Sequence, residues 1–195
     1  MKKKLLVIAC IAICVSIMAY GSLAYFTAED TATNVITSGA VEISVEEWTL
    51  ENGKRVPYPK EPLIGIMPDV TVSKIVTIKN EEANAFIRAK YEMIIKDSEG
   101  KVMELDEATK NSLIIITPNR EYWLLNGTND GWLYYKDSVD TGVVTEPLFT
   151  EVTFSGINMT NEYQNCTVEI VVDAQAVQVA NNGNDVFETA GWPEE

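Results

Sequence analysis

The chain contains no histidine, and this absence removes several kinds of active site. Without an imidazole, neither a Ser/His/Asp triad nor a Cys/His dyad can form, and zinc loses its commonest nitrogen ligand. Cations are also scarce, since 15 lysines and arginines stand against 29 aspartates and glutamates, a formal net charge of -14 over 195 residues. A field of that sign repels a phosphate backbone. We therefore expect a protein that is not an enzyme, has no metal or cofactor and binds no nucleic acid.

The first residues carry a targeting pattern. Three lysines at positions 2 to 4 precede an apolar run from Leu5 to Tyr20, and Ser22 and Ala24 then supply the small-x-small pattern that a type I signal peptidase reads. We predict a helical signal peptide over residues 1–24, cleaved between Ala24 and Tyr25. The exported chain then has 171 residues (195 minus 24) and a net charge of -17 (12 basic minus 29 acidic residues), which suits one domain with a substantial core.

Two other interpretations of this N-terminus remain open. Residues 5–28 carry no charge, which is long enough for an uncleaved anchor and would be the chain's one link to a membrane. The string Val7-Ile8-Ala9-Cys10 loosely resembles a lipoprotein box, although the apolar run continues well past it. Once the signal peptide is removed, Cys166 is the only thiol, so no intramolecular disulfide can form. We expect Cys166 to be a small buried residue of a strand.

The exported part is predicted to be β-structure, because its apolar residues recur with a period of two rather than 3.6. The alternation is clearest over Ala85–Lys96, where the odd positions from 87 to 95 are apolar and most even ones are charged. Further strands are expected at residues 41–45, 71–79, 113–117, 131–136, 148–154 and 167–179. Short helices or turns are expected at residues 104–112 and 185–190, and the proline-rich stretch 57–68 suggests an irregular excursion at a sheet edge. These features predict a single antiparallel β-sandwich with jelly-roll-like connections over residues 40–195.

Polar residues give no convincing catalytic or metal site. Pairs such as Glu46-Glu47 and Glu81-Glu82 occupy adjacent positions, which point to opposite faces of a strand and cannot converge on one metal. The stretch 137–142 superficially resembles a calcium loop but lacks the third acidic position and the distal Glu. Lys74 interrupts the apolar face of the strand predicted at 71–79. We interpret it as a lysine that protects a sheet edge, with a covalent Lys–Asn crosslink as the alternative.

The order of several short stretches resembles one family of exported proteins of Gram-positive bacteria. The stretches are 21–27 (GSLAYFT), 31–39 (TATNVITSG), 74–80 (KIVTIKN), 86–88 (FIR), 130–135 (DGWLYY), 147–154 (PLFTEVTF) and 174–181 (AQAVQVAN), followed by Gly191-Trp192. Together they are similar to the SipW-dependent TasA/camelysin family, and most similar to its BsaA branch of biofilm matrix proteins. One departure is Asp69, where such proteins often carry Gly after the Pro.

The resemblance implies a secreted fibre subunit with a jelly-roll fold, found in the extracellular matrix or at the cell surface. Its partners would be a dedicated type I signal peptidase, other copies of itself and a possible accessory matrix protein. The segment from Tyr25 to Gly39 has no proline and few charges. After cleavage it can add as a strand to the sheet edge of a neighbouring copy, with Tyr25, Phe26, Val35 and Ile36 setting the register. Such head-to-tail donation need not close, so it predicts pilin-like fibres rather than rings. The same segment could instead be the first strand of its own domain.

Two further functions are carried as alternatives. Camelysin in this family is described as a metalloprotease, but the chain has no His-Glu-x-x-His motif and no histidine from which to build one. The aromatic residues between positions 122 and 154 could form a platform for sugars or peptides, as in an adhesin, although a sandwich core needs large side chains too. The two readings differ in whether Trp123 and Trp132 are buried or lie side by side on the surface.

Overall fold

The computed structural model describes residues 35–37, 41–59, 68–127, 130–163 and 165–193. All of them belong to one compact unit that runs from Thr33 to Glu195. The predicted signal peptide, its cleavage site at Ser22, Ala24 and Tyr25, and Phe26 of the predicted donor strand lie outside the described residues.

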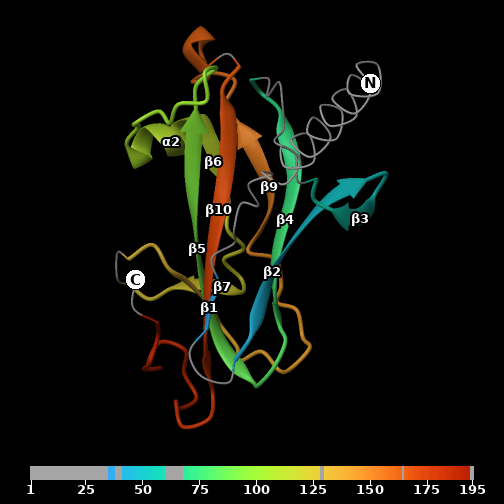
Figure 1. Ribbon diagram of the computed structural model, residues 1–195, viewed down its shortest axis with the longest axis vertical. Coiled ribbons are helices and arrows are strands. Elements are labelled where there is room, and N and C mark those ends of the chain that lie inside the picture. The colour runs from blue at the N-terminus through green and yellow to red at the C-terminus, as the bar shows by residue number, and fades with distance from the viewer. Residues whose placement is uncertain (1–34, 38–40, 60–67, 128–129, 164, 194–195) are drawn as a thin grey trace, which may run out of the picture. The chain divides into compact units, whose positions relative to one another are not determined.

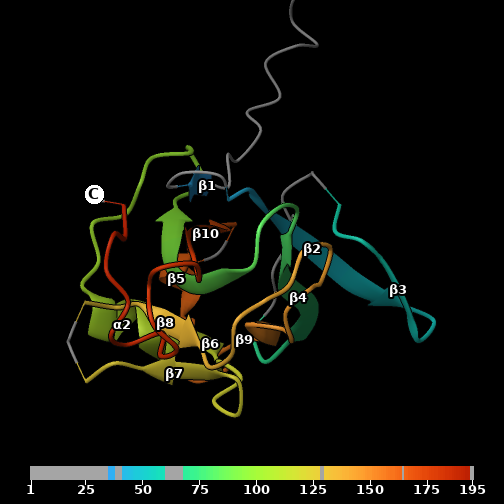
Figure 2. The same cartoon turned by 90° about the horizontal axis from the view of Figure 1, so that it is seen from below.

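Two sheets make up most of the described chain (Figures 1 and 2). Sheet A has the order β1-β10-β5-β8-β7, with β1 (Val35–Thr37), β5 (Ala85–Lys96), β7 (Trp123–Leu125), β8 (Leu133–Tyr135) and β10 (Thr167–Gln178). Sheet B has the order β3-β2-β4-β9-β6, with β2 (Ile43–Glu51), β3 (Lys54–Pro57), β4 (Thr71–Asn80), β6 (Ile114–Ile116) and β9 (Phe149–Phe154). Every described pairing is antiparallel except that of β1 with β10. The predicted all-β sandwich is confirmed.

The core lies between the two sheets and is built on the alternation seen in the sequence. On β5 the predicted apolar face is buried, and β10 pairs with β5 without interruption from Ala85 opposite Gln178 to Lys96 opposite Thr167. Residues from the inner faces of both sheets form one cluster, which includes Ile78 of β4, Ile87 of β5, Phe149 of β9 and Val172 of β10. Its buried side chains are almost all aliphatic or aromatic, so the hydrophobic effect holds the two sheets together.

Strand β4 is central in sheet B and carries an irregularity. It pairs with β2 on one side and with β9 on the other, and its register with β9 shifts between Ser73 and Val76. The shift leaves an extra residue on β4, as in a β-bulge, and bulges commonly redirect a side chain. Lys74 lies within this bulge.

Asp69 precedes β4 in the left-handed region of the backbone, with φ of 64°. Glycine adopts this region freely, and Asp is among the few other residues that tolerate it. Its neighbour across the turn is Gly156, where an added Cβ would lie 2.8 Å from Asp69 Cβ. The close approach therefore requires glycine at position 156.

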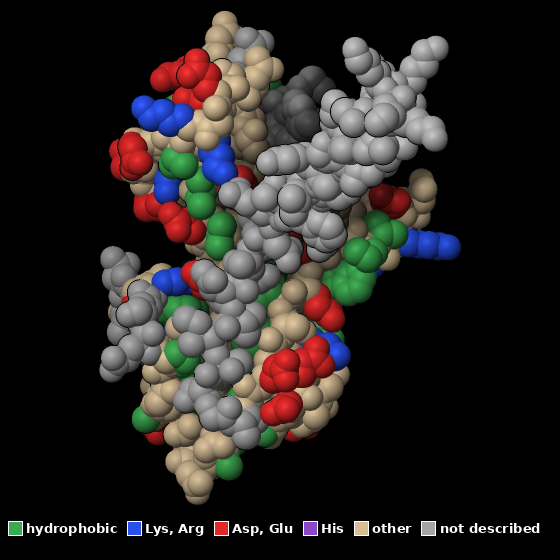
Figure 3. All heavy atoms as spheres, viewed as in Figure 1, with side chains coloured by type: hydrophobic (Ala, Val, Ile, Leu, Met, Phe, Trp, Pro, Cys, Tyr) green, Lys and Arg blue, Asp and Glu red, His purple; other side chains and the backbone are tan. Residues whose placement is uncertain are grey.

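Strands β2 and β3 form a hairpin that extends out from sheet B (Figures 1 and 2). Its two-residue turn is Asn52-Gly53, both with positive φ (51° and 76°), as a type I′ turn demands. Hydrophobic and basic side chains lie at this hairpin in Figure 3. The sequence pattern did not predict β3, because Pro57 and the prolines after it favoured an irregular segment; β3 accommodates Pro57 because it is an edge strand.

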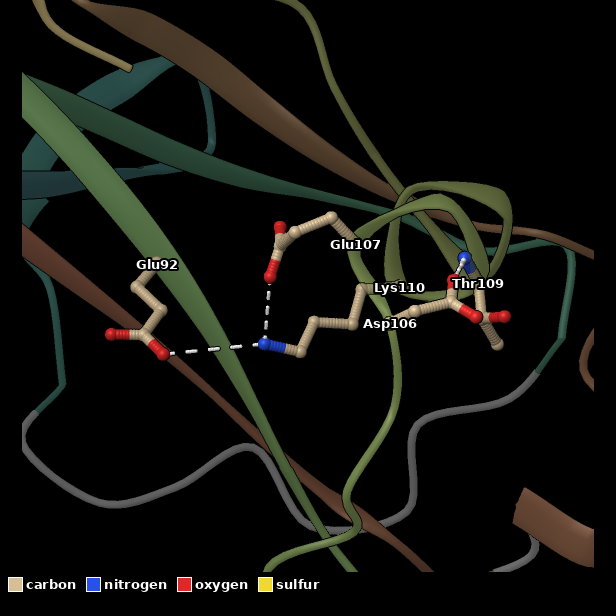
Figure 4. Close-up of polar contacts among 5 residues, drawn as sticks. All are labelled: Glu92, Asp106, Glu107, Thr109 and Lys110. Atoms are coloured by element: carbon tan, nitrogen blue, oxygen red, sulfur yellow. Dashed lines mark hydrogen bonds and ion pairs between the residues drawn. The ribbon is translucent and has the colours of Figure 1, made fainter. Parts of the chain in front are cut away.

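The one helix predicted near residues 104–112 is α2 (Glu107–Leu113), which begins and ends slightly later than expected. Asp106 caps it, since its Oδ1 accepts a hydrogen bond of 2.7 Å from the Thr109 amide, and this cap sets the start. Lys110 then reaches Glu107 at 2.9 Å and Glu92 of β5 at 4.0 Å (Figure 4). These pairs lie near the surface, and they tie the helix to sheet A only weakly.

The chain after β10 packs on the outer face of sheet A. The segment predicted to close with one helical turn at 185–190 forms a hydrogen-bonded turn instead, in which the Phe187 amide donates to Asp185 Oδ1. An Asp side chain that captures a nearby amide in this way favours a turn over a helix. Val186, Phe187 and Trp192 from this segment cover Phe86, Trp132, Tyr134 and Val177 of sheet A.

Candidate assembly surfaces

The edge of sheet A next to β10 is the first candidate surface. The three residues of β1 pair in parallel with Ala174–Ala176, with Val35 opposite Ala174 and Thr37 opposite Ala176. Strand β10 is much longer than β1, and among the described residues no strand pairs with Thr167–Asp173 on this side. Such an edge presents unpaired backbone donors and acceptors that another strand can use.

The structure thus places part of the predicted donor segment. Val35 and Ile36 lie in β1 and pair with β10 of the same chain. Tyr25 and Phe26 lie outside the described residues, as do the remaining positions of the segment up to residue 34. In the isolated chain, these three residues therefore follow the alternative interpretation, in which the segment is the first strand of its own domain.

Lys74 is not an edge-protecting lysine. It lies in the central strand β4, with only 6% of the residue exposed, and its Nζ forms a 2.7 Å ion pair with Glu47 Oε2 of β2. The same Nζ sits 4.0 Å from the ring centroid of Tyr58. Burial lowers the pKa of Lys74, and Glu47 opposes that shift; burial also raises the pKa of Tyr58, assisted by the Glu47 charge. A buried ammonium requires a carboxylate partner of this kind, which explains the position of Lys74 without a crosslink.

Arg88 connects strands of sheet A on its outer face and also contacts the C-terminal segment. It stands opposite Gln175 on β10 and Tyr134 on β8, and both are hydrogen-bonding partners. Gln175 Oε1 accepts from Arg88 Nε at 2.9 Å and Nη2 at 2.6 Å, while Nη1 lies 3.2 Å from the Tyr134 hydroxyl. The guanidinium carbon is 4.3 Å from the Trp132 ring and 4.7 Å from the Trp192 ring. This stack binds the C-terminal segment to the sheet.

The aromatic residues do not provide the surface platform on which a sugar-binding role depends. Trp123 is fully buried in the core, where its Nε1 donates to the Glu146 carbonyl at 3.0 Å. Trp132 is 4% exposed beneath Arg88 and the C-terminal segment. The two tryptophans therefore serve two different packed clusters, as the core-packing interpretation expected.

The paired carboxylates separate as the strand geometry predicts. Glu47 pairs with Lys74, whereas Glu46 takes the other face of β2 and contributes to the electrostatics at Lys79. A hydrogen bond from Lys79 Nζ to Glu81, at 2.6 Å, holds the pKa of Glu81 below its usual value. No group of three or more acidic or cysteine side chains within the described ranges is arranged to hold a metal ion, the stretch 137–142 included.

Cys166 is buried, as expected, although it comes immediately before β10 rather than within it. Its Sγ lies 3.7 Å from Met103 Sδ, and burial raises the pKa of the thiol. A thiol with a raised pKa is a poor nucleophile, so this cysteine has a packing role.

Comparisons with known proteins add no further identification. No family model, no curated protein and no solved structure matches the chain. Of the helices in the ranges described, none has the length and apolar character that a membrane crossing requires.

Proposed function

We propose that the chain is a structural subunit of extracellular biofilm matrix fibres, secreted by a Gram-positive bacterium and related to the BsaA branch of the TasA/camelysin proteins. In this proposal a type I signal peptidase releases Tyr25, and the new N-terminal segment is donated to the next copy. The observation that carries the proposal is the edge of β10, where a short parallel strand leaves Thr167–Asp173 without a strand partner in the described part of the chain.

The register of β1 on β10 predicts how a donated segment would pair with β10. Val35 stands opposite Ala174, so the same parallel register continued toward the N-terminus brings Ala32 opposite Val171 and Ala28 opposite Thr167. The segment from 28 to 34 then matches the free edge of β10 along its whole length. It contains no proline, so each of its residues can donate a backbone hydrogen bond.

Processing would act as the switch for assembly. Before cleavage the segment is tethered to the signal peptide, and afterwards it can pair with another copy. A strand given by one copy and accepted at a different surface of the next is a heterologous contact, which extends into a filament. Backbone hydrogen bonds supply affinity in such strand addition, and alternate side chains fix the register.

Two purified chains test the proposal directly, one from Tyr25 to Glu195 and one from Gly39 to Glu195. We expect fibres in electron micrographs of the longer chain only, because the shorter one keeps the acceptor edge and lacks the donor. Fibres from both chains, or from neither, would remove strand donation as the mechanism.

A pair of cysteines distinguishes donation to a neighbour from pairing within one chain. In a Cys166→Ala background, the proposed register would bring Ala32→Cys opposite Val171→Cys, and Val171 points outward because its neighbour Val172 faces the core. Oxidation should give a ladder of disulfide-linked oligomers in denaturing gels if the strand is donated, and closed monomers if it is not. The matched control is Thr31→Cys with Val171→Cys, which is one residue out of register and should crosslink poorly.

A further inference from the structure

The tip of the β2–β3 hairpin is unusual on so acidic a chain. Lys54 and Arg55 are both exposed there and form no ion pair with any described residue. Leu50, which stands opposite Arg55, is 50% exposed. Glu51 is the single acidic residue of the tip. Arg55 and Leu50 are cross-strand neighbours on one face of the hairpin, and Lys54 and Glu51 are cross-strand neighbours on the other, so the tip presents one cation on each face and an exposed apolar side chain beside Arg55.

The opposite end of β2 has the reverse character. Glu42 immediately precedes β2, and its carbonyl accepts the amide of Glu81 at 2.8 Å, which brings the loop after β4 to the same place. Glu82 and Asp140 join them, since Thr141 Oγ1 donates to the Glu82 carbonyl. Within the described part of the chain, Lys79 is the cation that forms an ion pair with one of these four carboxylates, Glu81. We call these residues the acidic end. Acidic side chains gather below the hairpin in Figure 3.

We infer that the β2–β3 hairpin tip of one copy docks on the acidic end of a second copy. The two surfaces are complementary in charge, and the same chain carries both. They lie at opposite ends of a nine-residue strand, roughly 27 Å apart at about 3.4 Å per residue, so they cannot meet within one chain. Contacts between different surfaces of identical copies extend without closing. The contact rests on the proposed function, since it is a second junction between the same fibre subunits.

Zero-length crosslinking tests the contact on the wild-type chain from Tyr25 to Glu195. A water-soluble carbodiimide joins a lysine amine to a carboxylate only when the two touch. We expect mass spectrometry to find Lys54 joined to Glu42 or to the peptide that carries Glu81 and Glu82. Because of the separation within one chain, each such link must connect two copies. Lys54→Arg should abolish the link and leave assembly unchanged, since the charge is kept. Lys54 linked elsewhere, or unlinked, overturns the inference.

Charge reversal gives an independent test. Lys54→Glu with Arg55→Glu should raise the concentration at which fibres form at least tenfold, and so should Glu42→Lys with Glu82→Lys. A 1:1 mixture of the two variants should assemble as the wild type does, because each hairpin then meets an end of opposite charge. Lys101→Glu with Arg120→Glu changes the net charge equally at exposed sites away from both surfaces, and should have less than a threefold effect. A mixture that fails to recover would overturn the contact.

The outcomes separate this contact from strand donation. If fibres and the disulfide ladder form but the Lys54 crosslink does not, strand donation is supported and the hairpin contact is contradicted. The Lys54 crosslink without fibres or ladder would leave the contact standing and remove the proposed function.

Discussion

Two cations sit within apolar strands of this sandwich, and the protein stabilises them in different ways. Lys74 of β4 is almost completely buried and pairs with the carboxylate of Glu47. Arg88 of β5 is half-buried and donates to two neutral oxygens, those of the Gln175 amide and the Tyr134 hydroxyl, while it stacks on two tryptophan faces. Both cations also contact aromatic rings, so the two sites differ in that Lys74 has a carboxylate as its partner, whereas Arg88 has neutral oxygens.

The chemistry of the two side chains explains the contrast. A lysine ammonium is compact and strongly hydrated, and its transfer away from water is unfavourable unless a carboxylate accepts its protons. A guanidinium is planar, delocalised and weakly hydrated, so it can stack between rings and share its N–H groups with neutral oxygens. The comparison teaches that Lys74 depends on one partner, whereas Arg88 depends on several, among them the C-terminal segment.

The largest effect is expected from Glu47→Gln, which leaves the buried ammonium of Lys74 without its carboxylate. Removal of one partner of a buried ion pair costs about 3–5 kcal/mol, and the partial exposure of Glu47 places our expectation at the lower end, about 3 kcal/mol. Urea denaturation measures the change. The double variant Glu47→Gln with Lys74→Met should recover most of it. If Glu47→Gln changes stability by less than about 1 kcal/mol, the ion pair is not what holds Lys74.

Arg88→Lys is expected to lower the free energy of unfolding by about 2 kcal/mol, because the ammonium cannot stack on both tryptophans while it donates twice to Gln175. Urea denaturation compares it with Lys74→Arg, the reverse exchange at the other site, which keeps the ion pair with Glu47. If Arg88→Lys lowers the free energy of unfolding no more than Lys74→Arg does, the planar geometry of Arg88 is unimportant. The proposed difference between the two sites is then wrong.

Trp192→Ala should have a smaller effect on global stability, about 1–2 kcal/mol, since it removes one face of the Arg88 stack and an edge contact with Tyr134. Its local effect should be larger. The segment from Asn181 to Pro193 should become sensitive to limited proteolysis, while amide exchange of β5 and β10 stays slow. Fast exchange throughout sheet A would mean that the C-terminal segment supports the whole sandwich.

These regions also differ in how far the sequence predicted them. The period-two pattern predicted β5 and its buried face, and it singled out Lys74 as an interruption of an apolar face. It could not assign Glu47 as the partner, because that pairing depends on the register of β2 with β4 and on the bulge. Arg88 looked like an ordinary outward charge, since nothing local indicates that the C-terminal segment returns to cover sheet A. Likewise, the pattern predicted a strand at 167–179, but it could not predict that β1 would pair with only Ala174–Ala176 of this strand.

The smallest effect is a pH dependence that only the lysine site should show. Burial lowers the pKa of Lys74 from its ordinary 10.5, so between the lowered pKa and 10.5 the unfolded chain binds more protons than the folded one. The free energy of unfolding therefore rises with pH across that window. Cys166 opposes this above 9.0, and Tyr58, Tyr91 and Tyr135 oppose it above 10.0, because the raised pKa of each group makes the folded chain bind more protons there. The measurement therefore uses a Cys166→Ala background. The rise should thus be measured by urea denaturation at pH values up to about 10. Lys74→Met should flatten it, and Glu47→Gln should steepen it, because the carboxylate that raises the pKa of Lys74 is gone.

Arg88→Met should leave the slope unchanged, since a guanidinium does not titrate in this range. If the free energy of unfolding still rises with pH in Lys74→Met, another group titrates in this range. The two cations then do not differ in pH dependence.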